Sequence, residues 1–464
     1  MSGKVLIIAS DFPPLAGTNT QRVQSFVRHL PRLGWDPVVI TRAVEDMYLI
    51  DSSQCGRVAH DIPILRVTDP DVFAWLRRRR GVVVQDIQRA AEAQSGDESD
   101  ALSTSGRQAS TAGIVRSGLR LARTVVMAWR RSFSYLPDVL APWAKRCAGE
   151  GVVLCRAHQK VRIVFASAPT YSCLVAGLEL AERRGLPFVA DFRDLWVGRP
   201  YRQVASRWHD WWDRRMERRV AYGARRIVLA SPAWIDHFRE FYGEEVAAKC
   251  VVITNGYDEA LIPEPRFRTP QADRVITFVS TGAMYDAESP APFLRALGNV
   301  LLRRPELRAR VRVRLIGYAG SEEHIMRGEI SHGGTEALVE LIGPQPHETC
   351  LLEQRSADVL LLFSGSEHLG TLRGKSFEYL SAGKPILALI PSHGTQAEFL
   401  RKAGTAVIVE HGDINHTERA VERMLTHPEA LTVMPDWAYI RQFERGVLAG
   451  ALAGTLDDIV RSAP

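Results

Sequence analysis

The chain has 464 residues, of which 46% are hydrophobic and 24% charged, and its formal net charge is +6. This length predicts two to three domains with large cores, in a composition that is ordinary for a soluble globular protein. No run approaches the roughly 18 uncharged apolar residues of a membrane span. The positive charge permits an anionic membrane or nucleic acid as partner.

The start of the chain and its cysteines both indicate a cytoplasmic protein. The first residues lead directly into a strand and do not form a signal peptide. The six cysteines have no paired spacing, which argues against a zinc site and a disulfide framework and fits reduced thiols. They are Cys55, Cys147, Cys155, Cys173, Cys250 and Cys350.

The N-terminal residues predict the first unit of a doubly wound sheet. An apolar strand over Lys4–Ser10 is followed by a loop with Gly17 and Thr18, a helix through Leu30, and a second strand over Val38–Thr41. Ligands of such sheets bind beyond the carboxyl ends of the strands. Gly17 would let a ligand approach the backbone, although a plain loop glycine is the alternative. No Gly-x-Gly-x-x-Gly occurs here, which argues against a dinucleotide site.

Residues 71–150 interrupt this regularity with a basic insertion. Arg77–Arg80 precede a Ser-rich segment over residues 91–111, which predicts mobility. Residues 114–131 then predict a basic amphipathic helix, and such a helix can lie in an anionic membrane interface. The alternative is a helix that packs on its own domain with its arginines in solvent.

Charged residues follow a strand in the middle of the chain. Strands are predicted over Arg162–Ser167 and Phe188–Ala190, and the second leads into Asp191, Arg193 and Asp194. The carboxyl end of a parallel strand is where active sites are built. Arg193 and Asp194 could instead form a structural ion pair.

The remaining elements predict a second, similar half. Further strands of the first half are expected at Arg226–Ser231 and Val251–Ile253, and a Pro-rich linker at Leu261–Gln271. The second series of strands covers Val275–Ser280, Val311–Ile316, Leu338–Ile342, Asp358–Phe363, Ile386–Leu389 and Ala406–Val409. Two doubly wound α/β halves would leave a cleft between their strand ends. The final segment, Asp436–Val460, predicts a helix that packs back across both halves.

The stretch Gly370–Leu389 carries the strongest chemical signal. It predicts a helix with Phe377, Leu380 and Ser381 inward, which ends at Gly383 before a buried strand. Backbone amides and Lys375 at the helix start favour an anion. Glu378, one turn later, is an acceptor suited to sugar hydroxyls. The spacing therefore indicates a nucleotide-sugar pocket.

Two other interpretations of this stretch were weighed. A P-loop needs four residues between its glycines, and only three separate Gly370 from Gly374, so an ATPase is excluded. A capped surface helix with Lys375 and Glu378 as solvated charges stays open.

Taken together, these pieces resemble the retaining family 4 glycosyltransferases, which have the GT-B fold of two Rossmann-like domains. The matching segments are Phe12–Gly17, Thr254–Asp258, Thr281–Gly282, Leu341–Gly343, Pro346–Glu348 and Gly374–Ile386.

The resemblance implies an acceptor-binding domain over residues 1–262, which contains the insertion, and a donor-binding domain over 263–435. Residues 436–464 would form the returning helix. Glu378 matches the second acid of the family's Glu-x7-Glu motif, which holds the nucleotide ribose. Lys375 would neutralise the leaving diphosphate, which amides at Thr371, Leu372 and Arg373 would cradle. The implied donor site also contains Gly282, Gly343, Glu367, Gly370 and Ser376, and the implied acceptor site contains Gly17, Thr18, Asp191 and Arg193.

The sequence departs from the family pattern at three places. The first acid of the motif falls on Gly370, so its contact to the donor sugar is absent or comes from Glu367. Met284–Asp286 replace the basic residues that usually follow the glycine turn. The family's His-Asp pair falls on Arg193 and Asp194.

With these departures the sequence still resembles a branch of the family that carries the segments Asp191–Trp196 and Gly374–Tyr379 together. That resemblance implies an active, retaining, hexosyltransferase-like enzyme that uses Lys375, Glu378, Arg193 and Asp194. The donor would be a nucleoside diphosphate sugar, with UDP favoured over GDP. The acceptor would be a glycan or lipid-linked sugar in bacterial surface polysaccharide assembly, at the inner face of the cell membrane. No cofactor is expected, and no metal, since no Asp-x-Asp ligand pair is evident. The alternatives are a catalytically silent binding subunit, a non-hydrolysing nucleotide-sugar epimerase and, last, a nucleic-acid binder, for which no reader motif is present.

Overall fold

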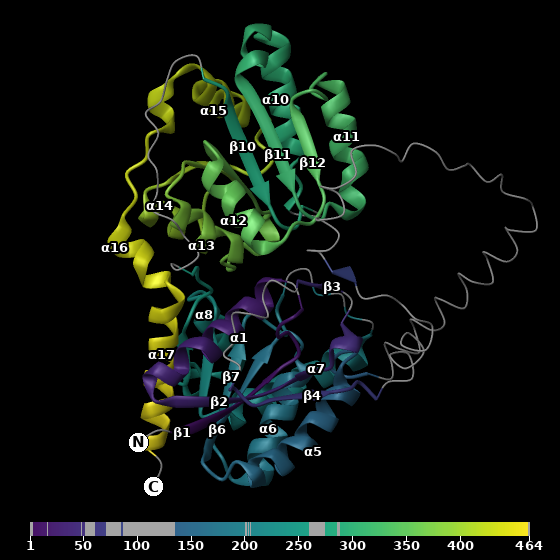
Figure 1. The fold of residues 1–464 in the computed structure, drawn as a ribbon, viewed down its shortest axis with the longest axis vertical. Coiled ribbons are helices and arrows are strands. Elements are labelled where there is room, and N and C mark those ends of the chain that lie inside the picture. Colours follow the sequence, from purple (N-terminus) through teal and green to yellow (C-terminus); the bar gives the residue numbers. More distant parts are fainter. Residues whose placement is uncertain are drawn as a thin grey trace, which may run out of the picture. The chain divides into compact units, whose positions relative to one another are not determined.

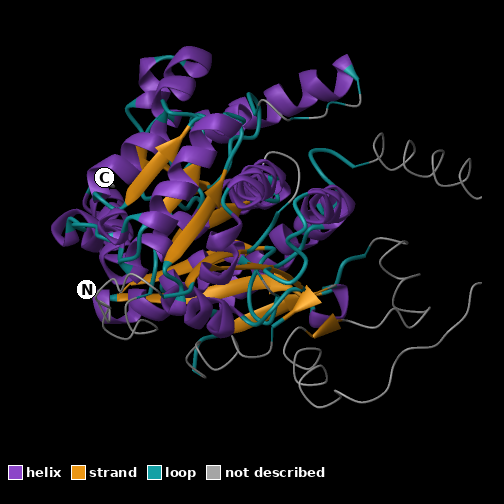
Figure 2. Cartoon of the chain, turned by 90° about the horizontal axis from the view of Figure 1, so that it is seen from above, coloured by secondary structure: helices purple, strands orange, loops and turns teal. Residues whose placement is uncertain are grey.

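The protein is described from a computed structural model, which covers residues 3–15, 17–47, 49–51, 61–70, 85–86, 135–199, 202, 204, 206–258, 274–284 and 288–462. The chain divides into two compact units. The first comprises Met1–Val228, Phe238–Val251 and Thr455–Pro464, and the second comprises Leu229–His237 and Val252–Gly454. Figures 1 and 2 show helices on both faces of the strands within each unit. The domain boundaries proposed from sequence after residues 262 and 435 stay predictions.

The first unit is built on a seven-stranded parallel sheet in the order β4-β2-β1-β6-β7-β8-β9. Its strands are β1 (Gly3–Ala9), β2 (Trp35–Arg42), β4 (Ile64–Val67), β6 (Val161–Ala168), β7 (Phe188–Phe192), β8 (Arg226–Leu229) and β9 (Cys250–Val252). Two short strands, β3 (Leu49–Ile50) and β5 (Gln85–Asp86), pair separately. The helices are α1 (Thr18–His29), α5 (Ala141–Ala157), α6 (Ser172–Arg184), α7 (Arg207–Gly223) and α9 (Glu244–Ala247), and α8 (Trp234–Tyr242) contains residues of both units.

The second unit has a six-stranded parallel sheet in the order β12-β11-β10-β13-β14-β15. Its strands are β10 (Ile276–Thr281), β11 (Val311–Ile316), β12 (Val339–Ile342), β13 (Val359–Phe363), β14 (Ile386–Leu389) and β15 (Ala406–Val409). The helices are α10 (Ala291–Arg303), α11 (Glu323–His332), α12 (His347–Ser356), α13 (Gly374–Ala382), α14 (Thr395–Ala403), α15 (Ile414–Thr426), α16 (Trp437–Ile440) and α17 (Arg445–Arg461).

Strand β13 shows why the second sheet is covered on both faces. Its five residues are all apolar and all buried. Val359 and Leu361 pack into one core with α10, α11 and α15, whereas Leu360 and Leu362 pack into another with α13 and α14. Strands buried on both faces read as continuous apolar runs, which is how these strands were recognised. Each strand predicted from sequence overlaps a strand of the structure, which confirms the predicted doubly wound α/β fold class.

The last part of the insertion proposed for residues 71–150 lies in a helix of the first unit. Residues 141–150 belong to α5, which continues to Ala157. Trp143 of this helix is fully buried and donates a hydrogen bond from Nε1 to the carbonyl of Val67, 2.9 Å away. Arg77–Arg80 and the predicted amphipathic helix over residues 114–131 lie outside the described residues.

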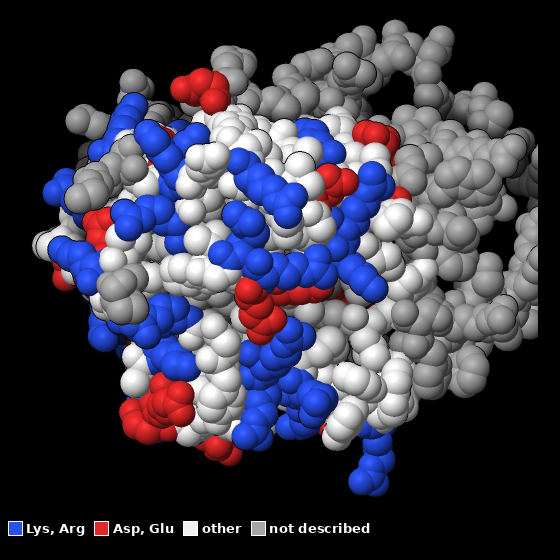
Figure 3. Space-filling model, turned by 90° about the horizontal axis from the view of Figure 1, so that it is seen from below, with Lys and Arg blue, Asp and Glu red and all other residues white. Residues whose placement is uncertain are grey.

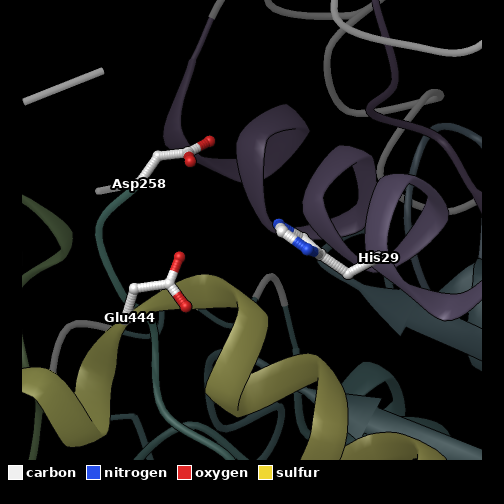
Figure 4. Close-up of side chains that lie close together, drawn as sticks. All are labelled: His29, Asp258 and Glu444. Carbon is white, nitrogen blue, oxygen red and sulfur yellow. The ribbon is translucent and has the colours of Figure 1, made fainter. Parts of the chain in front are cut away.

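The C-terminal segment is two helices and not the single one predicted. A short 3-10 turn separates α16 from α17, because the backbone of Tyr257 exchanges hydrogen bonds with Phe443 and Arg445. Gly256 permits this approach, since a Cβ there would lie 2.2 Å from the carbonyl oxygen of Phe443. Figure 4 shows Glu444 at the start of α17 and Asp258 in the segment after β9. Both belong to the second unit, whereas His29 in the same view belongs to the first.

No helix in the described part of the chain is long and apolar enough to cross a membrane. The five cysteines in that part form no disulfide. Arginine and lysine side chains are frequent on the face drawn in Figure 3.

Candidate functional site

Helix α13 is a core element of the second unit and not a surface helix. Phe377, Leu380 and Ser381 are buried as predicted, and Gly383 ends the helix with a φ of +64°. The side chain of Glu378 is only 10% exposed and that of Lys375 only 11%. The alternative in which both are solvated charges is therefore wrong.

Glu378 is held by two side chains of α12. One of its carboxylate oxygens lies 2.8 Å from Nε2 of His347, at the start of α12. The other accepts a hydrogen bond from Nε2 of Gln354 at 3.2 Å. Gln354 also donates to the hydroxyl of Thr281, at the end of β10. Burial raises the pKa of Glu378, but His347 and Arg445 outweigh burial and hold the pKa below its ordinary value.

Lys375 contacts a carboxylate that the sequence did not single out. Its Nζ lies 2.8 Å from Oε2 of Glu288 and donates to the carbonyl of Ala283 at 3.2 Å. The other oxygen of Glu288 lies 2.9 Å from Nη1 of Arg373. Burial raises the pKa of Glu288, but Lys375 and Arg373 outweigh it, so the carboxyl stays ionised. One carboxylate thus bridges two cations at the start of α13, and we call these three residues the Glu288 triad.

The loop amides before α13 are not arranged as predicted. The amide of Thr371 donates to the carbonyl of His368, and that of Arg373 donates to Oε1 of Gln396. These two amides are therefore already engaged, and Leu372 between them is buried in the core. In the first turn of α13, the amide of Ser376 donates to the carbonyl of Arg373 at 3.1 Å, so the amides of Gly374 and Lys375 are the first-turn donors expected to face an anion. The predicted Ser376 lies there too and is fully buried.

The other predicted donor residues lie on turns of the second unit. Gly282 follows β10 with a φ of +96°, a backbone conformation that favours glycine. A Cβ at Gly282 or Gly343 would meet no atom within 4 Å. At Gly370, a Cβ would lie 3.6 Å from that of Ala233, so this position faces protein. Glu367 lies in a 3-10 turn before it and is half-buried.

Asp191, predicted to contact an acceptor, is instead part of the core of the first unit. Its carboxylate is fully buried and accepts two hydrogen bonds from Arg22 of α1, at 2.8 and 3.1 Å. A third comes from the hydroxyl of Ser167 at 2.7 Å. These bonds join α1, β6 and β7, which is a structural role.

The remaining acceptor residues also lie in the first unit. Arg193 follows β7 and is buried, which lowers its pKa against the opposing effect of Asp194. Asp194 is partly exposed. Gly17 is exposed at the start of α1 with a φ of +128°, and a Cβ there would meet no atom within 4 Å. Thr18 is the first residue of α1. Their roles stay predictions.

Sequence reasoning missed Glu288, Gln354 and the partnership of His347 with Glu378. His347 stood inside a quoted motif, but nothing linked it to Glu378, which is 31 residues away. Gln354 is seven residues after His347 on one helix, a spacing that puts both on one face. For Glu288, an acid just before an apolar helix reads as an ordinary first-turn residue.

Two family models match consecutive parts of the chain. The model described as Glycosyltransferase Family 4 matches residues 82–261, and the model described as Glycosyl transferases group 1 matches residues 263–439. A curated relative, D-inositol 3-phosphate glycosyltransferase from Paenarthrobacter aurescens, is 26% identical over 226 residues. That match covers 46% of this chain and 53% of the relative, so the chain spans about half the length of the curated relative.

Solved structures agree on the fold. Sucrose-phosphate synthase from Thermosynechococcus elongatus has a TM-score of 0.62 at 14% identity, with 99% of this chain and 100% of that chain covered. HepE of Anabaena, in complex with UDP and glucose, has a TM-score of 0.60 at 14% identity, with 98% and 100% covered. The two parallel sheets, their flanking helices and these structural matches establish the GT-B fold. The two family models confirm the resemblance seen in the motifs. The chain belongs to the family 4 glycosyltransferases of the GT-B fold.

Proposed function

We propose that this protein is a retaining glycosyltransferase that moves a sugar from a nucleoside diphosphate sugar to a hydroxyl group. The observation that carries the proposal is the start of α13, where Lys375 and Arg373 lie beside the first helical turn and Glu378 is buried one turn further. Cations at a helix N-terminus suit a diphosphate. A buried, ionised carboxylate suits a ribose hydroxyl.

In the proposed mechanism the bond between the anomeric carbon and the diphosphate oxygen breaks while the acceptor hydroxyl attacks from the same face, and the hydroxyl proton passes to the departing diphosphate oxygen. Negative charge then grows on the departing diphosphate. Lys375 and the amides of the first turn of α13 would stabilise it, because fixed donors are worth most where charge develops. Arg193 and Asp194 would act on the acceptor side.

UDP is the proposed nucleotide, since HepE, a protein of the same fold, was solved with UDP and glucose. The proposed acceptor is a glycan or lipid-linked sugar of bacterial surface polysaccharide assembly. The reaction is proposed to need no metal. Full activity after dialysis against a chelator would support that last point, and loss of activity restored by Mg²⁺ would contradict it.

A ligand screen tests the proposal directly. Thermal unfolding would be followed with UDP, GDP and their sugars, because a ligand at a hundred times its Kd stabilises the folded state by about 2.7 kcal/mol. The stabilising donor would then be incubated with lipid-linked and free glycans, and the anomeric configuration of the product read by NMR. Inversion would refute the retaining mechanism. Binding without transfer would favour the silent subunit, and an epimerised donor without acceptor would favour the epimerase.

We also propose an anionic membrane surface as a partner through the basic insertion. Arginines near an anionic bilayer contribute about 1 kcal/mol each. A variant with Arg77–Arg80, Arg116, Arg120 and Arg123 changed to Gln should remain in the supernatant with anionic liposomes, whereas the parent pellets at low salt and is released as salt rises. The control changes Arg303, Arg312 and Arg327, exposed arginines of the second unit, to Gln and should still pellet. If the insertion variant pellets like the parent, the insertion is not the anchor.

A further inference from the structure

In the Glu288 triad, two cationic side chains that could bind an anion are paired with the protein's own carboxylate, that of Glu288. Lys375 and Arg373 are both within 2.9 Å of one oxygen each of Glu288. All three side chains are between 11% and 18% exposed, so their charges are only partly screened by water. Two positive charges and one negative charge leave a net charge of +1.

The position of Glu288 makes this pairing informative. It lies just before α10, in the segment after the glycine turn of β10, and its partners lie at the start of α13. The carbonyl of Ala283, next to Gly282, binds the same ammonium of Lys375 at 3.2 Å. The carboxylate therefore ties the turn after β10 to the helix start that offers amides to an anion.

We propose that Glu288 is an internal counter-anion that occupies the diphosphate seat in the empty protein and gives way when the donor binds. This inference rests on the proposed function, because it takes the ligand of Lys375 to be a diphosphate. A diphosphate carries at least two negative charges and can bind both cations and the helix start, whereas Glu288 carries one. The carboxylate keeps the two cations in place without a ligand. It also weakens the retention of the nucleoside diphosphate product, because it repels an anion that stays in the seat.

As a counter-anion, Glu288 would have a role different from that of the first acid of the Glu-x7-Glu motif, which this sequence lacks. That acid falls on Gly370, where a side chain would begin in contact with Ala233 and not at the triad. A Glu288 that held the donor sugar through its hydroxyls would bind UDP-sugar and leave UDP unaffected. A Glu288 that competes with the diphosphate must affect UDP and inorganic pyrophosphate alike.

The test measures the affinity of the parent and of Glu288→Gln for UDP, pyrophosphate and uridine by calorimetry. Glu288→Gln should bind UDP and pyrophosphate on the order of tenfold more tightly, since one repulsive charge at close range is removed. Uridine affinity should not change. Glu288→Asp keeps the charge and should bind UDP like the parent. Raising the salt concentration should shrink the difference between parent and Glu288→Gln.

Glu329→Gln is the matched control, because the side chain of Glu329 is 12% exposed against 14% for Glu288. Glu329 lies on α11 and pairs with Arg295 of α10, outside the triad. It should leave UDP affinity unchanged. The inference would be overturned if folded Glu288→Gln bound UDP and pyrophosphate no more tightly than the parent does. It would also be overturned if neither UDP nor pyrophosphate bound to the parent or to the variant. If pyrophosphate binds the parent, and binds the variant more tightly, but UDP does not bind the parent, then the role of Glu288 as a counter-anion is supported and the proposed nucleotide-sugar function is contradicted.

Discussion

The two units each contain an ion cluster that joins helices to the ends of parallel strands, and the two clusters differ in one respect. In the first unit, Asp191 is fully buried and its carboxylate accepts three hydrogen bonds from Arg22 and Ser167. In the second unit, the Glu288 triad is partly exposed and has one cation in excess. A buried and balanced cluster has no capacity left for a ligand. A partly open cluster with excess positive charge can exchange its carboxylate for an anion.

The largest expected effect is on the buried cluster. Asp191→Ala removes the buried carboxylate that pairs with the guanidinium of Arg22, and breaking a buried ion pair in this way costs about 3–5 kcal/mol. Urea unfolding monitored by circular dichroism would measure it. The matched control is Glu182→Ala, which breaks an exposed pair with Arg219 and should cost less than about 1 kcal/mol. If both variants lost a similarly small free energy of unfolding, the structural role of Asp191 would be contradicted.

Changes in the Glu288 triad should lower the rate of sugar transfer and leave the stability of the protein unchanged. Lys375→Ala should lower the turnover of sugar transfer about 100-fold or more, in the range found when one charge-stabilising donor is removed. Donor affinity should fall less, because the charge matters most as the diphosphate leaves. Lys375→Arg should not restore turnover, since a forked guanidinium does not replace a compact ammonium. Equal losses in turnover and affinity would make Lys375 a uniform binder.

Glu378 lies between the two extremes, since it is buried like Asp191 but belongs to the donor site. Glu378→Ala should weaken nucleotide binding about tenfold to a hundredfold, the equivalent of a charge-assisted hydrogen bond. The contacts with His347 and Gln354 also predict a loss of about 1–3 kcal/mol in the free energy of unfolding, because both side chains lose a buried acceptor. Calorimetry with UDP and thermal unfolding without it would measure the two effects. Unchanged UDP affinity would contradict the ribose role.

The lowered pKa of Glu378 adds a test by pH. Its stabilising contribution is fully present above the unfolded value of 4.5 and is lost as pH falls through the lower folded pKa. Glu378→Gln removes this titration, so unfolding of the parent should depend more steeply on pH below 4.5 than that of the variant. Parallel curves would contradict the assigned pKa direction.

The smallest effect is expected at Glu217, a buried carboxyl of the first unit on α7. Its carboxylate accepts the amide of Val197 at 2.8 Å, and burial raises its pKa to about 8. Because the pKa of Glu217 is higher in the folded state, its contribution to the free energy of unfolding is fully present below the unfolded pKa of 4.5. That contribution is lost as the pH rises towards 8. Glu217→Gln should remove part of the decrease in Tm between pH 6 and pH 9, a shift of about 2–4 °C for each kcal/mol. An identical pH dependence in parent and variant would show that Glu217 ionises normally.

The sequence by itself determined the fold and its chemical centre. Continuous apolar runs such as Val359–Phe363 defined strands buried on both faces, and Gly383 defined the end of α13. These signals are local, because strand burial and helix termination depend on residues a few positions apart. The motif segments were also contiguous, so the family could be recognised without coordinates.

Only the tertiary structure decided which charges meet. Glu288 and Lys375 are 87 positions apart, and Arg22 and Asp191 are 169 apart, so no local period could pair them. Only the tertiary structure places Asp191 in the core and pairs the amides of Thr371 and Arg373 with other acceptors. It also shows that the C-terminal helix is interrupted where Phe443 and Arg445 bond to Tyr257. Burial and hydrogen bonding of polar groups depend on which elements pack together, and that packing is set by the whole sheet and not by any one segment.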